Sequence, residues 1–183
     1  MLFHVVRNCM RQSFNISFPI IFMFILCSFN PKDRMTTTND NIERYERLAL
    51  QSNKIGKEYA VDLTGIEGCN KSRVKYLGLV STQKGKKYKV LTSFYVFRTG
   101  KDNCHGTSSI KVYDFSNKFI GRYYVGMPND LPDTLIGSKL IYSKTQDDCP
   151  LRKGTSISLL KGLPKSIFLP CSQTGGDVYT FSN

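Results

Sequence analysis

From residue 55 onward the chain is a succession of short apolar runs separated by Gly, Pro, Asn and Asp, and this pattern limits the possible folds more than any other feature. Several runs alternate apolar with polar residues, which is the period of a half-buried strand. Eight runs qualify as strands: 57–63, 72–82, 86–97, 108–115, 119–126, 138–144, 155–160 and 177–182. Because no helical pattern separates them, the sequence predicts an all-β fold, a small antiparallel β-barrel or β-sandwich of about eight strands.

Turn-forming residues predict where the chain reverses. Gly85 lies among lysines between two of the runs, and Asn117 lies between two others. Both residue types accept the positive φ that tight hairpins need. Segments 127–137 and 161–177 each contain two prolines, which remove donors from a sheet ladder. We therefore expect both segments to be loops, the second leading to the last strand.

A short helix is expected before the strands. Asn39 or Asp40 is predicted to cap a helix over residues 41–52. The apolar positions near helical spacing are Ile42, Tyr45, Leu48 and Ala49. Such a short amphipathic helix is expected to pack at the edge of the β domain.

The first 28 residues have the layout of a secretory signal peptide. A basic start without acids precedes the apolar run 18–26, which is too short to cross a bilayer as a helix. Leu26 is not the small residue that precedes a lipid-bearing cysteine, so cleavage soon after Cys27 is expected instead of lipidation. The predicted organisation is a signal peptide over 1–28, a tether and short helix over 29–54, and one β-rich domain over 55–183.

Four cysteines remain after residue 28, and an even number in an exported chain predicts disulfide bonds. The favoured pairing is Cys149 with Cys171 and Cys69 with Cys104, and two other connectivities are equally compatible with the spacing. The absence of a CxxC pair argues against a zinc ribbon and against a thioredoxin-like redox centre. No metal or cofactor is expected.

Candidate catalytic groups are few. His105, the only histidine outside the first ten residues, directly follows Cys104, and adjacent residues of a strand point to opposite faces. We therefore interpret His105-Gly106 as a bend before the strand over 108–115. GxSxG and phosphate-loop motifs are absent. Loop carboxylates that a glycan hydrolase would use are Asp130, Asp133 and Asp148, together with His105. No catalytic residue is assigned, and a binding role is favoured over an enzymatic one.

A basic tract is the strongest functional indication in the sequence. The chain has a formal net charge of +12, and residues 68–101 contain nine basic residues and no acid. We interpret the hairpin over 73–97 as a binding surface. Its candidate binding residues are Arg73, Lys75, Lys84, Lys86, Lys87, Tyr88 and Lys89. Clustered lysines attract polyanions, although lysines on strands also protect sheets from aggregation.

Together these features predict an exported, non-enzymatic β domain, in the periplasm, the outer envelope or outside the cell, that engages another macromolecule through the basic hairpin. The expected partners are an anionic polymer or an envelope protein. Export excludes cytoplasmic nucleic acid, and membrane contact is expected only through an uncleaved signal or a lipid on Cys27. Two alternatives stay open: a cell-wall or glycan hydrolase using loop carboxylates, and a barrel that carries a small apolar ligand.

Overall fold

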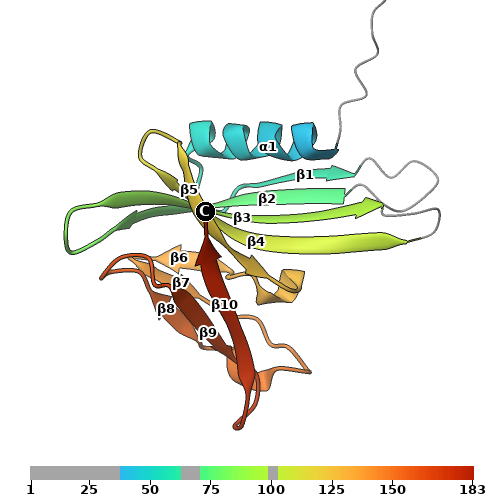
Figure 1. Cartoon of the computed structure of the whole chain (residues 1–183), viewed down its shortest axis with the longest axis vertical. Coiled ribbons are helices and arrows are strands. Elements are labelled where there is room, and N and C mark those ends of the chain that lie inside the picture. The colour runs from blue at the N-terminus through green and yellow to red at the C-terminus, as the bar shows by residue number, and fades with distance from the viewer. Residues whose placement is uncertain (1–37, 63–70, 99–102) are drawn as a thin grey trace, which may run out of the picture. The chain divides into compact units, whose positions relative to one another are not determined.

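The computed structural model describes residues 38–62, 71–98 and 103–183. Within these ranges the chain forms one α-helix, ten strands and two 3₁₀-helices (Figure 1). In chain order they are α1 (Thr38–Ser52), β1 (Glu58–Asp62), β2 (Lys71–Ser81), β3 (Lys87–Arg98), β4 (Cys104–Asp114), β5 (Phe119–Val125), η1 (Pro128–Asp130), β6 (Thr134–Ile136), β7 (Lys139–Ile141), η2 (Pro150–Arg152), β8 (Ser156–Ser158), β9 (Ser166–Pro170) and β10 (Gly176–Ser182). The fold is therefore mostly β with one helix before the strands, as predicted.

The strands form two antiparallel sheets. Seven strands pair in the order β1-β2-β3-β4-β5-β10-β9, and three pair in the order β6-β7-β8. β10 joins β5 through two residue pairs only, Phe181 with Tyr123 and Ser182 with Arg122. Among the described residues the larger sheet ends in the edge strands β1 and β9, so it does not close into a barrel.

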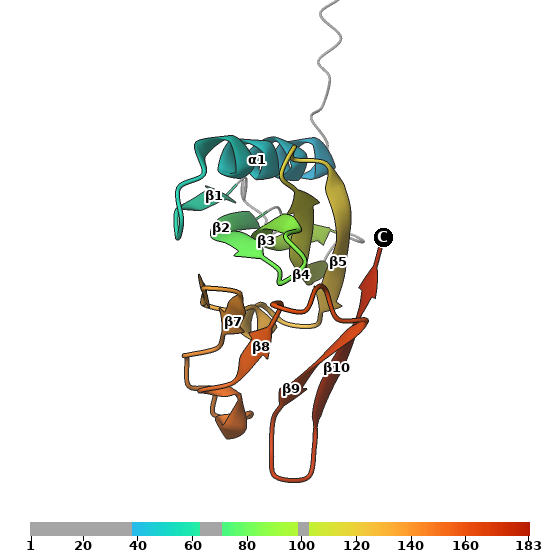
Figure 2. The ribbon, with the colours of Figure 1, turned by 90° about the vertical axis from the view of Figure 1, so that its left-hand side faces the viewer.

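The main core lies on one face of β2–β5. Strand alternation brings its side chains together with residues in or just after β7 and β8 and with residues of β9. Figure 2 shows β7, β8 and β9 on the side of the sheet away from α1. The buried members are Leu77, Val80, Val90, Ile110, Tyr123, Val125, Leu140, Tyr142, Leu159, Ile167 and Leu169. A shift of register between Tyr76 and Gly78 changes the alternation in β2, so that Val80 points into this core.

The opposite face of the sheet is covered by α1. Ala49 and Leu50 of the helix pack against Val74, Leu91 and Tyr113. A polar contact accompanies this apolar one, because the Glu46 carboxylate accepts hydrogen bonds from the Tyr113 hydroxyl at 2.8 Å and from Lys111 Nζ at 2.5 Å. The helix therefore packs across the face of the sheet, and the expected position at the edge of the domain is wrong.

Two details of the predicted helix also differ. The helix begins at Thr38 and already includes Asn39 and Asp40, so it starts before the predicted cap positions. Ile42 and Ala49 are buried as expected, but Leu48 is 39 % exposed and Leu50 is buried in its place. The buried Glu46 explains why Leu50 and not Leu48 faces the sheet. The hydrogen bonds of Glu46, as well as the spacing of the apolar residues, set which side of the helix is buried.

Both segments that were predicted as proline-rich loops contain a short strand. β6 lies within 127–137 and β9 lies within 161–177. Each is an edge strand, β6 of the smaller sheet and β9 of the larger one. β6 contains no proline, and Pro170 is the last residue of β9, where it is tolerated because only one side of an edge strand needs ladder donors.

The predicted turns are confirmed, whereas the bend at His105-Gly106 is not. Gly85 has φ of 76° and Asn117 has φ of 69°, the left-handed conformation that their hairpins require. β4 begins at Cys104, so His105 and Gly106 are strand residues, paired with Phe97 and Val96 of β3. β3 is long enough to pair with β4 back to Cys104, so β4 begins before the apolar alternation from which its start was predicted.

The favoured disulfide between Cys149 and Cys171 is confirmed, and it ties the start of η2 to the end of β9. Cys104 is also disulfide-bonded. Cys69, its favoured partner, lies outside the described residues, as do the predicted signal peptide and residues 29–37 of the tether. In the described part of the chain, no helix is both long and apolar enough to cross a membrane.

Candidate functional site

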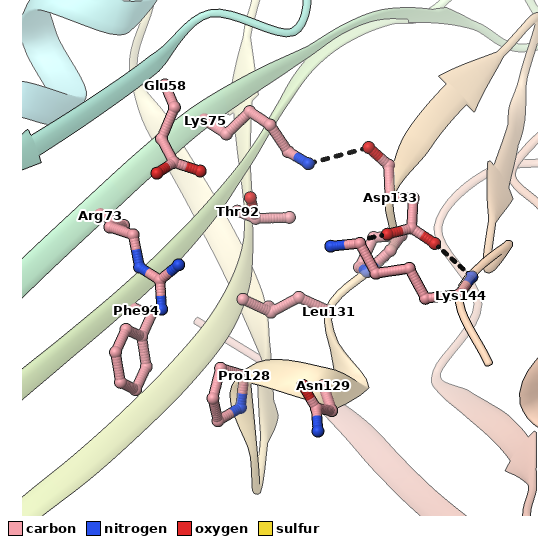
Figure 3. Close-up of a pocket in the computed structure, with 11 residues that line it drawn as sticks. Glu58, Arg73, Lys75, Thr92, Phe94, Pro128, Asn129, Leu131, Asp133 and Lys144 are labelled. Atoms are coloured by element: carbon pink, nitrogen blue, oxygen red, sulfur yellow. Dashed lines mark hydrogen bonds and ion pairs between the residues drawn. The ribbon is translucent and has the colours of Figure 1, made fainter. Parts of the chain in front are cut away.

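A polar groove lies on the face of the larger sheet that α1 does not cover. Arg73 pairs with Phe94 and Lys75 pairs with Thr92, and these four side chains alternate with the residues that contact the helix. The segment after β5 lies opposite them (Figure 3). The groove has a volume of about 150 Å³ and is lined by Glu58, Arg73, Lys75, Thr92, Phe94, Pro128, Asn129, Leu131, Pro132, Asp133 and Lys144.

Asp133 organises one wall of the groove. Its carboxylate accepts hydrogen bonds from the Ser143 amide at 2.6 Å, the Ser143 hydroxyl at 2.9 Å and the Lys144 amide at 3.0 Å. It also pairs with Lys144 Nζ at 3.1 Å. Because its oxygens already have these partners, Asp133 holds the loop after β7 in place and positions the Lys144 ammonium at the groove.

Lys75 enters the groove from the sheet. Its ammonium donates to the backbone carbonyl of Asp133 at 2.9 Å, which is a neutral acceptor (Figure 3). Burial, and then repulsion from Lys144, lowers the pKa of Lys75 below its ordinary value of 10.5, although Asp133 and Glu58 partly oppose this. The Lys144 ammonium is thus held close enough to disfavour the charge on Lys75.

Arg73 supplies the third cation of the groove. The Arg73 guanidinium lies over the Phe94 ring, 5.3 Å from its centroid, which restricts the long side chain and leaves its donors available. Pro128 and Leu131 give the groove an apolar wall. An anionic group entering here would meet Arg73, Lys75 and Lys144, with Glu58 as the one carboxylate that is not engaged by the loop after β7.

The structure divides the predicted basic hairpin into two places. Arg73 and Lys75 line the groove, whereas Lys84, Lys86 and Lys87 are exposed at the β2–β3 turn. Given a rise of about 3.3 Å per residue, the turn lies roughly 20 Å from Lys75 along the hairpin. The candidate residues therefore do not form one continuous contact.

Lys89 has a structural position. It is only 6 % exposed, and its ammonium donates to Asn117 Oδ1 at 2.7 Å and to the Leu50 carbonyl at 3.4 Å. Leu50 is in the last turn of α1, where carbonyls lack helical donors and a cation is favourable. Tyr88 is half-buried against the main core. Lys89 therefore does not present its charge on an open hairpin surface, as the sequence prediction required, and Tyr88 is only partly exposed.

The carboxylates considered for a hydrolase have other partners. The Asp130 carboxylate is buried and bonded to Arg152, to the Tyr179 hydroxyl at 2.8 Å and to the Met127 amide at 3.0 Å. Arg152, itself 2 % exposed, also bonds Asp177 at 2.6 Å. This network connects η1 to η2 and to β10. A buried ion pair such as Asp130 with Arg152 is tolerated when each charged group also has further hydrogen-bond partners, as both have here.

His105 does not meet these acids. Its ring lies 6.1 Å from that of Phe97, on the face that α1 covers farther along the sheet, whereas Asp133 lines the groove on the opposite face. Asp148 is exposed in the loop before Cys149. In the described ranges no three His, Cys, Asp or Glu side chains come together as a metal site would require. The apolar-ligand carrier would need a cavity between the sheets, but core side chains fill that space in the described structure.

Asn129 and Lys144 were not predicted as parts of any site, and Asp133 was considered only as a carboxylate of the hydrolase alternative. Lys144 is far from Lys75 in sequence and lies in the loop after β7, so no local pattern connects them. The acid-free tract over 68–101 did indicate Arg73 and Lys75, which line the side of the groove formed by the larger sheet.

Fold and groove together define a disulfide-linked, mostly β domain with a small basic groove beside its larger sheet. Comparison with protein-family models, with curated proteins and with solved structures gives no match.

Proposed function

We propose that the protein is an exported, non-enzymatic binding domain for an anionic macromolecule, and that the groove receives one anionic group of that partner. The observation that carries the proposal is the convergence of Arg73, Lys75 and Lys144 on one hollow. Asp133, which pairs with Lys144, also has hydrogen-bond partners in the loop after β7. The Cys149–Cys171 disulfide supports an oxidising compartment for the partner.

The size of the groove favours part of a polymer over a free small molecule. Its volume of about 150 Å³ is below the roughly 300–1,000 Å³ of sites that enclose a small ligand. One phosphate, sulfate or carboxylate with part of the residue that bears it fits this space. Neighbouring residues of the polymer would extend over Asn129 and the exposed edge strand β1.

The charges of the groove predict how the binding affinity should change with pH and with salt concentration. An anion beside Lys75 and Lys144 would relieve their mutual repulsion, so binding raises the pKa of Lys75 and is strongest while Lys75 is protonated. Affinity should fall as the pH rises through the lowered pKa of Lys75, before the ordinary value of 10.5 is reached. It should also fall with added salt, because both partners release counterions.

The test measures binding of three small anionic probes by calorimetry: tripolyphosphate, trigalacturonate and a sulfated heparin disaccharide. Such probes are too short to reach both the groove and the β2–β3 turn. Lys75→Met, which keeps the apolar stem, should lower the affinity of the best probe about tenfold through loss of one charged hydrogen bond. Arg73→Met should have a similar effect.

Lys84→Met is the matched control, since it removes one lysine of the same hairpin from an exposed position outside the groove. It should leave probe affinity unchanged. The proposal is wrong if none of the three probes binds at low salt, or if Lys84→Met weakens binding as much as Lys75→Met does.

A further inference from the structure

A second surface is formed by three turns at the other end of the β2–β3 hairpin. We call residues 82–88, 114–120 and 159–162 the hairpin-tip surface. The first two turns share an open hollow of about 630 Å³, lined by Gly85, Lys86, Lys87, Tyr88, Asp114, Phe115, Ser116 and Ile120. The third is joined to the first by a hydrogen bond from the Gln83 amide to the Leu160 carbonyl at 2.8 Å (Figure 1).

Phe115 is the unusual residue of this surface. It occupies the β4–β5 turn, where polar residues are the rule, and it is 62 % exposed. Lys87 Nζ and Lys89 Nζ lie 5.7 Å and 5.8 Å from the centroid of its ring. Leu160 in the adjacent turn is also exposed. Neither Phe115 nor Leu160 belongs to the described core.

The charge around Phe115 is mostly positive. The three turns contain five lysines, Lys84, Lys86, Lys87, Lys118 and Lys161, all exposed. Their one acid, Asp114, accepts a hydrogen bond from the Lys118 amide at 2.8 Å and so is used within its own turn. The surface is therefore an exposed aromatic side chain among lysines.

We propose that the hairpin-tip surface docks on a lipid bilayer with anionic headgroups. Phe115 would enter the interfacial region, where aromatic rings partition favourably, and the surrounding lysines would contact the headgroups. A soluble polyanion would use the lysines but has no apolar layer for Phe115 and Leu160. This contact is distinct from the groove, and it does not depend on the predicted N-terminal signal.

The first experiment is co-sedimentation of the natively produced protein with vesicles of phosphatidylcholine and phosphatidylglycerol in equal amounts, with pure phosphatidylcholine as the neutral comparison. Wild-type protein should bind the anionic vesicles more tightly. Lys84→Ala/Lys86→Ala/Lys87→Ala should lower the partition coefficient on the order of 100-fold. Phe115→Ala should lower it on the order of tenfold, because the buried apolar area is lost.

Phe168→Ala is the matched control, since Phe168 is a second exposed phenylalanine, 53 % exposed on the edge strand β9. It should bind vesicles as the wild type does. The chain contains no tryptophan, so Phe115→Trp introduces a single tryptophan, which can be excited selectively, at the proposed contact. Its emission should shift to shorter wavelength on anionic vesicles, whereas that of Phe168→Trp should not.

Equal binding to neutral and anionic vesicles by all variants would overturn the proposal, as would wild-type affinity of Phe115→Ala. Lysine-dependent binding without a spectral shift in Phe115→Trp would identify a purely electrostatic surface for a soluble polyanion, which also contradicts bilayer docking. Lys75→Met should bind vesicles normally. An experiment that disproves anion binding in the groove would therefore leave the proposal for the hairpin-tip surface untouched, and the reverse also holds.

Discussion

At the scale of single residues, Asp133 links the groove to the stability of the domain. Burial raises the pKa of Asp133, but the hydrogen bonds from Ser143 and Lys144 outweigh burial and hold it below the ordinary value of 3.8. An acid whose pKa is depressed by folding stabilises the folded state above its unfolded pKa, and this contribution is lost as the pH falls through the folded pKa.

Asp133→Ala should therefore lower the free energy of unfolding by about 2 kcal/mol near pH 7, with a smaller difference from wild type below pH about 4. Urea denaturation at both pH values measures this difference. Asp148→Ala, at an exposed position of the next loop, should change stability by less than about 0.5 kcal/mol. A pH-independent effect of Asp133→Ala would contradict the role given to its charge.

At the scale of elements, the buried Glu46 carboxylate fixes how α1 packs on the sheet. Its partners Lys111 and Tyr113 are neighbours on one face of β4, so a single helix residue contacts two positions of the strand. Burial, followed by the charge of Glu46, raises the pKa of Tyr113, which keeps its hydroxyl a donor at every physiological pH. Apolar contacts alone would permit the helix to rotate or slide along the sheet.

Glu46→Ala should lower the free energy of unfolding by about 3 kcal/mol, because the partially buried Lys111 ammonium loses its counter-charge. Thermal unfolding followed by far-ultraviolet circular dichroism measures the loss. Glu43→Ala, which removes an exposed acid from the same helix, is the control and should be nearly neutral. Equal effects of the two substitutions would mean that helix propensity, and not the buried contact, decides the outcome.

At the scale of the whole molecule, the disulfide between Cys149 and Cys171 connects parts of the chain that belong to different sheets. It closes a loop over a sequence separation of 22, which stabilises the fold by about 3 kcal/mol in the chain-entropy model. The double variant Cys149→Ser/Cys171→Ser should lose roughly this amount in urea denaturation.

The matching test of compartment uses the protein as the cell exports it. Intact mass should show that the predicted signal is absent, and the cysteines after residue 28 should be alkylated only after reduction. Free thiols at Cys149 and Cys171 in that sample would argue against the predicted export.

Local sequence determined the nature and approximate limits of most elements. Alternating side chains specify strands because the faces of a strand repeat every two residues, and Gly85 and Asn117 specify hairpins because their backbones accept positive φ. The strands β6 and β9 were missed because a proline excludes a central strand, and only the tertiary arrangement makes each an edge strand.

Only the tertiary structure decided what each lysine does. Lys86, Lys87 and Lys89 lie in one acid-free tract, yet Lys89 is buried beneath the end of α1 while the other two are exposed. Lys144 reaches Lys75 only because the second sheet packs across the first. The physical reason is that desolvation and charge pairing depend on which elements meet in space, whereas backbone conformation depends largely on the residue and its immediate neighbours.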